Sequence, residues 1–565
     1  MKKRKKLNLF NTFFLTTLLF VVPTFSDENN QKVYKNSADA HYNLGMAYFN
    51  GGDLGRAVDH LKQAILYNPE LVVAHNSLGM VYYERGMIVD AIKHYRIAIQ
   101  FDPNFVDAHN NLGVVYVNNG LVDEAIEEWK IAISLKPDDG NFHYNLGVCY
   151  TKKETIDAAL NAFQSAIQYK FDFAEAHNNL GNIYIQKNLP EKAIEEYELA
   201  IKYNPEFIEA RNNLGVVYNK QGRIEDALRE WEKIVDYSFD FAEAHYNLGI
   251  TYYNQGRIDE AIVKYQLALE YAPDNAEAHN HLGLAYFKQG RVQEAVKHYK
   301  LALRFEPSYA EAHNNLGKAW HELDRIDDSI QEYLLAIRNK FDYSEAHYNL
   351  GLVYEDKGKI DTAMHEYRIA IEYYPKYAEA YYSLGSVHEK EKQFEEAIKN
   401  YKLAIKNKSK YFDAYFSLGK LYLKLEKLEE ALWNFKSAIK FNPDIMGIHY
   451  SLGQIYVKQN NFEKAVEEFK KAVKNNPSYP ETYYHLGITY KKLGKWEDAI
   501  KHFKLAIKSK PDYIEAYNAL GLLYFEQGKI EDSINEYKFA ILYKPDYVVA
   551  LDNLEKAIKT QQKGN

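Results

Sequence analysis

The chain has 565 residues, of which 26% are charged and 47% hydrophobic, and its formal net charge is −8. This composition excludes a membrane-embedded bundle and a disordered chain, and the single cysteine, Cys149, excludes an intrachain disulfide. The acidic balance disfavours nucleic acid as a partner, because binding to phosphates needs a basic surface.

The first 26 residues differ in composition from the rest of the chain. Five basic residues occupy positions 2–6, a largely apolar run extends from Leu7 to Val22, and Ser26 precedes two acidic residues. This order is typical of a secretory signal peptide cleaved after Ser26, since the run is shorter than the roughly 20 residues of a spanning helix. An uncleaved membrane anchor is the alternative, and both place the rest of the chain outside the cytoplasm. We expect an exported protein, periplasmic or associated with the envelope, in which residues 27–37 are a short linker.

One fixed period dominates the chain from Ala38 onward. The pair Leu-Gly at 44–45 returns at 78–79 and at 112–113, and it keeps this interval up to 520–521, which gives fifteen repeats in 38–547 without an insertion. Numbered within each repeat, position 8 is always glycine, position 20 is alanine or serine, and position 24 is aromatic except at Leu61. Position 27 is alanine except at Ile234, and position 32 is proline in eleven repeats.

This pattern predicts two packed helices in each repeat. Small residues at positions 8, 20 and 27 allow the helix axes to approach to about 8 Å. Residues at positions 14–16, such as 255–257, turn the chain between the helices, and glycine there ends the first helix. Proline at position 32 ends the unit because it cannot continue a helix.

These positions resemble the tetratricopeptide repeat family over residues 38–565. The resemblance implies an all-α, right-handed superhelical solenoid of fifteen helix-turn-helix repeats, with the first helices lining the concave face. Residues 548–565 are expected to form a C-terminal capping helix, with Leu551, Leu554 and Ile558 inward and Lys556, Lys559 and Gln562 outward. The phrase Ala-His-Asn-Asn-Leu-Gly, at 108–113 for example, is similar to the repeats of O-GlcNAc transferases. The sugar-transfer domain that follows those repeats is not seen here, so we expect no enzyme activity and no cofactor.

Ten repeats carry histidine at position 4, where the family often has tryptophan. Neighbouring repeats set these side chains about 10 Å apart, too far to share a zinc ion whose ligand nitrogens lie about 2.0–2.1 Å from it. We therefore expect local hydrogen bonding in place of a large aromatic residue, with pH-tuned packing near pH 6 and a metal ladder as the alternatives. The ten are His41, His75, His109, His143, His177, His245, His279, His313, His347 and His449.

Positions 2, 6, 9 and 13 fall on one helical stripe, which the resemblance places in the concave groove. Asparagine at position 6 predicts a ladder of amides that bonds an extended peptide; the alternative is that these residues only reflect repeat duplication and face solvent. The asparagines are Asn43, Asn111, Asn145, Asn179, Asn213, Asn247, Asn315 and Asn349. Acidic residues at position 2 would complete the groove, although they also suit a helix N-terminus: Glu175, Glu209, Glu243, Glu277, Glu311 and Glu345.

Charge divides the array at residue 377. Residues 38–377 carry 51 acidic and 33 basic residues, whereas 378–565 carry 25 acidic and 30 basic residues and belong to a part rich in lysine and tyrosine. We therefore predict two binding surfaces, 38–377 for neutral or basic extended segments and 378–547 for a more acidic partner. A scaffold that binds partner proteins is the favoured function. An accessory subunit that recruits substrates for a separate enzyme such as a glycosyltransferase, and a rod that self-associates head to tail, are the alternatives.

Overall fold

The computed structural model describes residues 28–441 and 447–564 of the chain. These residues form 31 α-helices and contain no β-strand. The predicted signal peptide, residues 1–26, lies outside the described residues. In the part of the chain that the structure describes, no helix combines the length and the apolar character needed to cross a membrane.

The helices form two compact units, and the division falls between Tyr271 and Ala272. The helices of the first unit are α1 (Glu28–Asn50), α2 (Leu54–Tyr67), α3 (Val72–Glu84), α4 (Ile88–Phe101), α5 (Val106–Asn118), α6 (Val122–Leu135), α7 (Gly140–Lys152), α8 (Ile156–Tyr169), α9 (Ala174–Gln186), α10 (Pro190–Tyr203), α11 (Ile208–Lys220), α12 (Ile224–Tyr237), α13 (Ala242–Asn254) and α14 (Ile258–Tyr271).

The second unit continues the same alternation of first and second helices. Its helices are α15 (Ala276–Lys288), α16 (Val292–Phe305), α17 (Ala310–Glu322), α18 (Ile326–Asn339), α19 (Ser344–Asp356), α20 (Ile360–Tyr373), α21 (Ala378–Lys390), α22 (Phe394–Asn407), α23 (Phe412–Lys424), α24 (Leu428–Ile439), α25 (Ile448–Lys458), α26 (Phe462–Asn475), α27 (Pro480–Lys492), α28 (Trp496–Ser509), α29 (Ile514–Glu526), α30 (Ile530–Tyr543) and α31 (Val548–Gly564).

The turn inside each hairpin needs a left-handed backbone conformation. Gly256 adopts it with a φ of 79°, and glycine is the residue that enters this region most easily. Six repeats place another residue there, with φ between 57° and 61°, so the turn is kept even where the sequence lacks glycine. They are Glu154, Asn188, Asp324, Lys392, Glu426 and Asn460.

The two helices of a hairpin meet at the glycine of position 8. A Cβ atom on Gly317 would lie 2.7 Å from the ring of Tyr333, which is buried in the facing helix. The alanines of positions 20 and 27, such as Ala363 and Ala370 of repeat 10, are fully buried beside the equivalent contact of their own repeat. The small residues therefore do what the sequence predicts, because they make room for one large ring in each repeat.

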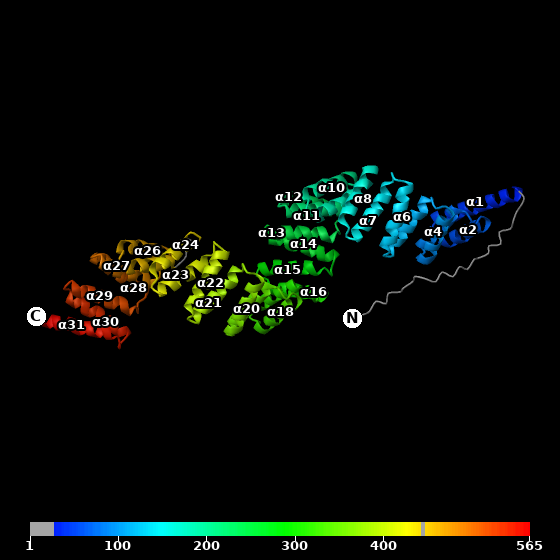
Figure 1. The fold of residues 1–565 in the computed structure, drawn as a ribbon. Helices are drawn as coiled ribbons and strands as arrows, with labels where there is room; N and C mark the ends of the chain where they lie inside the picture. The colour runs from blue at the N-terminus through cyan, green and yellow to red at the C-terminus, as the bar shows by residue number, and fades with distance from the viewer. Residues whose placement is uncertain (1–27, 442–446, 565) are drawn as a thin grey trace. The chain divides into compact units, whose positions relative to one another are not determined.

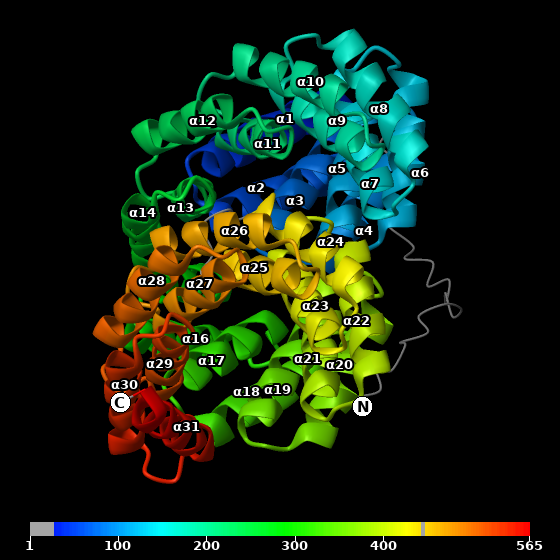
Figure 2. The same ribbon diagram turned by 90° about the vertical axis from the view of Figure 1, so that its left-hand side faces the viewer.

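Within each unit, successive hairpins follow one another along the chain (Figure 1, Figure 2). The first helices of neighbouring repeats contact each other, for example α3 with α5, α9 with α11 and α17 with α19. The first helices therefore form one layer of each unit, and the predicted all-α solenoid of helical hairpins is confirmed.

The start of the array differs from the prediction. Residues 27–37 were expected to be a linker, but the chain is helical from Glu28, so that α1 is 23 residues long. No glycine or proline interrupts 28–37, and the ring of Tyr34 packs against that of Tyr67, with centroids 5.9 Å apart. This contact favours continuation of the helix ahead of the first repeat.

The buried face of α31 is also different from the one we predicted. Ala550 and Ala557 are fully buried and Leu554 is partly buried, whereas Leu551 and Ile558 are exposed. Residues at positions 4 and 11 of a full repeat contact position 23 of its own second helix, as Tyr82 contacts His94. Leu551 and Ile558 occupy positions 4 and 11 of α31, and no described second helix covers them. The outward positions of Lys556, Lys559 and Gln562 are as predicted.

Candidate functional site

The asparagines of position 6 all lie on the first helices of their repeats. Asn43 is exposed, whereas Asn315 and Asn349 are each only 8% exposed. The remaining five are partly buried: Asn111, Asn145, Asn179, Asn213 and Asn247. These residues recur along the first-helix layer of each unit, where Ser77 and His281 interrupt the column, and most of them are not fully open to solvent.

Asparagines of this column donate hydrogen bonds to the preceding repeat. The acceptor is the side chain at position 5 of that repeat. Asn179 donates to the hydroxyl of Tyr144 at 3.3 Å. In five further pairs Nδ2 lies 2.9–3.0 Å from an asparagine Oδ1: Asn111 to Asn76, Asn213 to Asn178, Asn247 to Asn212, Asn315 to Asn280, and Asn349 to Asn314.

The amide ladder therefore joins neighbouring repeats, a role that the sequence did not reveal. Sequence analysis did not single out the residues of position 5, which accept these bonds. The adjacent pair Asn-Asn in the repeat phrase could have indicated them. A carboxamide has two N–H groups and an oxygen with two lone pairs, so one inter-repeat bond leaves capacity for a peptide. Peptide binding by these asparagines stays a prediction.

Asn212 is the most highly connected member of the ladder. Its Oδ1 accepts from Trp231 Nε1 at 3.1 Å and from Asn247 at 2.9 Å, and its Nδ2 donates to Glu243 at 2.7 Å. One side chain thus joins the core ring of its own repeat to the first helix of the next. Such a network orders the first-helix face before any partner binds, which lowers the entropic cost of association.

The acidic residues of position 2 lie along the same face. Glu243 and Glu345 accept bonds from the asparagine ladder, and Glu345 also pairs with Lys318. Glu311 lies 3.6 Å from Lys340. Glu175, Glu209 and Glu277 are exposed. Exposure and internal bonding therefore both vary along the acidic column.

A hollow of about 270 Å³ opens on the first-helix face of the second unit. Asn349 lines it together with Lys318 and His321, which come from α17. His321 Nε2 lies 2.8 Å from the carboxylate of Asp356, one repeat further along. The hollow thus combines an amide with charged groups of both signs, and an extended peptide can use all of these.

The histidines of position 4 are bonded locally, as predicted. In eight of them Nε2 lies 2.8–3.3 Å from the backbone carbonyl six residues earlier, in the loop that precedes the repeat. Arg211 and Tyr483, which occupy the same position, donate to the equivalent carbonyls of Pro205 and Pro477. Position 4 therefore ties the first helix to the inter-repeat loop, whichever side chain it carries.

The second nitrogen of these histidines meets position 23 of the same repeat. Five pairs are formed with glutamate, at Nδ1–oxygen distances of 2.5–2.7 Å: His109 with Glu128, His177 with Glu196, His313 with Glu332, His347 with Glu366, and His449 with Glu468. Three pairs are formed with a second histidine, with the Nδ1 atoms 3.0–3.1 Å apart: His41 with His60, His75 with His94, and His279 with His298.

The imidazole pKa is shifted in opposite directions in His109 and His177, which pair with glutamate, and in His75 and His279, which pair with histidine. Burial lowers the pKa of His75 and His279, and it lowers those of His94 and His298 to about 4, helped by the neighbouring histidine. Burial also opposes the charge of His109, but its hydrogen bonds to Glu128 and to the Pro103 carbonyl outweigh burial and raise the pKa.

Family models match most of the repeat array. A model described as TPR repeat matches residues 79–120, 149–188, 181–222, 217–256, 251–290, 283–324, 422–460, 453–494 and 489–528. Models described as tetratricopeptide repeat match 348–412, 38–71, 106–139 and 514–547. A search of curated proteins finds no match.

Several solved structures are similar to parts or most of the chain. The crystal structure of MamA is 30% identical over 29% of this chain and 97% of MamA, with a TM-score of 0.28. YrrB, "a TPR protein with an unusual peptide-binding site", is 23% identical over 33% of this chain and 95% of YrrB, with a TM-score of 0.29. The APC/C hetero-tetramer Cut9-Hcn1 is 13% identical over 94% of this chain and 98% of its matched chain, with a TM-score of 0.36.

The assignment to a family therefore rests on the repeat models, which account for more than half of the sequence. They agree with the helical hairpins and with the glycine, alanine and aromatic contacts inside them. The chain belongs to the tetratricopeptide repeat family, whose fold is generally a non-catalytic scaffold for protein–protein interaction.

Proposed function

We propose that this protein is an exported scaffold that binds extended segments of partner proteins along its first-helix face. The observation that supports this proposal is the asparagine ladder, in which amides of neighbouring first helices are held at hydrogen-bond distance. A ladder that is ordered in advance offers donors and acceptors at a regular spacing, and an extended backbone can match it.

The charge division supports two binding surfaces along the array. Residues 38–377 have a net charge of −18, and residues 378–565 have a net charge of +5. Charge of one sign along a surface favours encounter with partners of the opposite sign. We therefore assign neutral or basic segments to the first surface and a more acidic partner to the second.

Photo-crosslinking from living cells tests the proposal. A crosslinking residue placed at Glu175, on the first helix α9, should capture a partner, whereas one at Glu195, on the second helix α10, should not. Both glutamates belong to the same repeat and both are exposed, so the pair is matched. Equal capture from the two positions, or capture from neither, would exclude the first-helix face as the binding surface.

A third crosslinker tests the division into two surfaces. Lys420 is exposed on the first helix α23, in the lysine-rich part of the array. We expect it to capture a different partner from the one captured at Glu175. Recovery of the same partner from both positions would contradict the two-surface assignment and leave a single groove.

Export is tested separately, by cell fractionation and by sequencing the N-terminus of the mature protein. A mature chain that begins at Asp27 in the extracytoplasmic fraction supports a cleaved signal peptide. An intact N-terminus in the membrane fraction would support an uncleaved anchor, and an intact soluble cytoplasmic protein would contradict export.

A further inference from the structure

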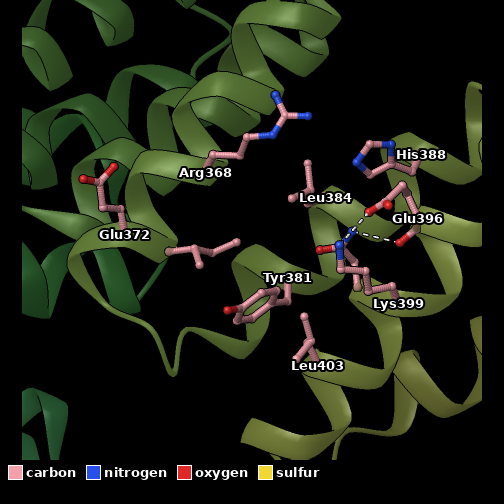
Figure 3. A pocket seen from close by; sticks show the side chains of 10 residues that line it. Arg368, Glu372, Tyr381, Leu384, His388, Glu396, Lys399 and Leu403 are labelled. Carbon is pink, nitrogen blue, oxygen red and sulfur yellow. Dashed lines mark hydrogen bonds and ion pairs between the residues drawn. The ribbon is translucent and has the colours of Figure 1, made fainter.

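Two hollows lie at equivalent places in repeats 11 and 12, away from the first-helix face. The first, of about 460 Å³, lies between α20, α21 and α22, and side chains such as Arg368, Tyr381 and Lys399 surround it (Figure 3). The second, of about 490 Å³, lies between α22, α23 and α24. Their linings correspond position by position, with isoleucine at position 28, leucine at 7, glutamate at 19 and asparagine at 23.

The side chain at position 23 differs between repeat 9 and the two repeats with hollows. In repeat 9, Glu332 extends to His313 and fills the space between the two helices of the hairpin. In repeats 11 and 12 the residue is Asn400 or Asn434, and its Nδ2 donates at 2.8 Å to a backbone carbonyl of its own helix. The shorter side chain turns away from position 4, so space remains beside it.

Two of the charged groups that line the first hollow form an ion pair. Lys399 Nζ lies 3.3 Å from Glu396, and both side chains line the hollow (Figure 3). His388 Nδ1 lies 2.6 Å from Gln393 Oε1. Among the described residues that line the first hollow, no buried polar atom lacks a hydrogen-bond partner.

The second hollow is distinguished from the first by an exposed indole ring and by an amide oxygen without a hydrogen-bond partner. Trp433 replaces the lysine of position 22 and is 60% exposed, with its ring beside that of Tyr415 at 5.9 Å. Asn434 is 3% exposed, and its Oδ1 is buried without a hydrogen bond from any described residue. A buried carbonyl oxygen without a donor is costly, so the oxygen favours a ligand that brings one.

The lining of the second hollow defines the chemistry of that ligand. Ile405, Leu418, Tyr422 and Trp433 supply an apolar and aromatic wall. Glu429 and Glu430 also line it, and the Glu429 carboxylate already accepts from Gln459 at 2.8 Å. The ligand should therefore be a flat apolar group that carries no negative charge and has one hydrogen-bond donor. Indole has these properties, because its N–H donates and it has no acceptor to satisfy.

We propose that the hollow formed by α22, α23 and α24 binds a tryptophan side chain of a partner protein. The indole N–H donates to Asn434 Oδ1, and the ring packs against Trp433 and the apolar wall. The site lies on the second-helix side of the hairpins, so it is independent of the first-helix face and does not depend on the proposed groove.

Binding of N-acetyltryptophanamide to the full-length protein tests this assignment, with saturation-transfer NMR as the readout. We expect the probe to bind, and its analogue methylated at the indole nitrogen to bind about fivefold more weakly, because one hydrogen bond is lost. This comparison uses the unaltered protein and does not depend on the folding of a variant. Absence of binding, or equal binding of both probes, would overturn the proposal.

Two variants locate the site. Asn434→Leu removes the acceptor and should weaken binding of the probe about fivefold or more while circular dichroism stays unchanged. Asn400→Leu makes the same change in the preceding repeat and should leave binding intact. Equal loss in both variants, or none in Asn434→Leu, would contradict the site. Tighter binding of N-acetyltyrosinamide or N-acetylargininamide than of the tryptophan probe would contradict the choice of ligand.

Discussion

Repeats 9 and 12 of the second unit share one hairpin framework and differ in what fills it. Repeat 9 pairs His313 with Glu332, and it receives and donates amide bonds through Asn314 and Asn315. In repeat 12 the corresponding residues are Tyr415, Asn434, Phe416 and Ser417, and Ser417 meets the hydroxyl of Tyr382 at 3.3 Å. The comparison shows that glycine, alanine and one large ring are enough to build the hairpin. The side chains of positions 4 and 23 differ between the filled and the hollow repeat, and those of positions 5 and 6 determine the bonds between repeats.

The largest expected effect is on the contact that both repeats share. Gly317→Ala places a Cβ 2.7 Å from Tyr333, whereas Gly419→Ala places one 3.0 Å from Phe435. We expect Gly317→Ala to lower the local free energy of unfolding by about 2–3 kcal/mol and Gly419→Ala by about 1 kcal/mol. Hydrogen exchange of α17–α18 and α23–α24 measures both, because a long solenoid does not unfold in one step. Equal costs would mean that the hollow in repeat 12 gives its ring no freedom to move.

The next effect concerns position 23 itself. Glu332→Ala leaves the buried His313 without its partner and should cost about 1–3 kcal/mol. Asn434→Ala removes a side chain whose oxygen has no partner, and we expect a change within about 0.5 kcal/mol. Hydrogen exchange of the same helices compares the two variants. A larger cost for Asn434→Ala than for Glu332→Ala would reverse the distinction between filled and hollow repeats.

Two histidine pairs, those of His298 and His177, make their hairpins sensitive to pH. His298 has a pKa lowered to about 4 in the folded state, so its contribution to stability is complete above pH 6.5 and is lost as the pH falls toward 4. His177 has a raised pKa, so its contribution is complete below pH 6.5 and is lost as the pH rises through the raised value.

We therefore expect opposite changes between pH 7.5 and pH 5. After correction for intrinsic exchange rates, α15–α16 should open about tenfold more readily at pH 5, and α9–α10 should open less readily. Helices α23 and α24 contain no histidine and serve as the internal control. A uniform response of all three hairpins would show that the pairs do not control the pH dependence.

The smallest expected effect on stability concerns the bonds between repeats, which are formed by amides in repeat 9 and by hydroxyl groups in repeat 12. Asn315→Ala removes a buried bond to Asn280 and should cost about 1 kcal/mol, seen as faster exchange in α15 and α17. Ser417→Ala removes a longer contact to Tyr382 and should cost less than about 0.5 kcal/mol. If the serine variant were the more damaging, the ladder would not be the stronger inter-repeat link.

Much of the fold could be predicted because the contacts that form each hairpin join residues close together in the sequence. The spacing of glycine, alanine and a ring within one repeat determines the hairpin, and the same pattern recurs fifteen times in one frame. The local bonding of the histidine column was also predictable, since neighbouring repeats separate these side chains too far to share an ion. The limits of the array were less predictable, because the extension of α1 and the buried face of α31 depend on which neighbours are present.

The candidate sites depended on contacts that the period does not show. Position 6 was visible as a column of asparagines, but its acceptors at position 5 belong to the preceding repeat. The hollow beside Asn434 is formed by three helices, so no single repeat shows it. The sequence also does not indicate that the side-chain oxygen of Asn434 lacks a hydrogen-bond partner.

The sequence alone therefore determined the repeat, its two helices and the family, because these follow from short-range periodicity. Only the tertiary structure decided which polar groups pair across repeats and which remain unpaired. Such pairing depends on the exact separation of side chains on different helices, and hydrophobic period carries no information about it.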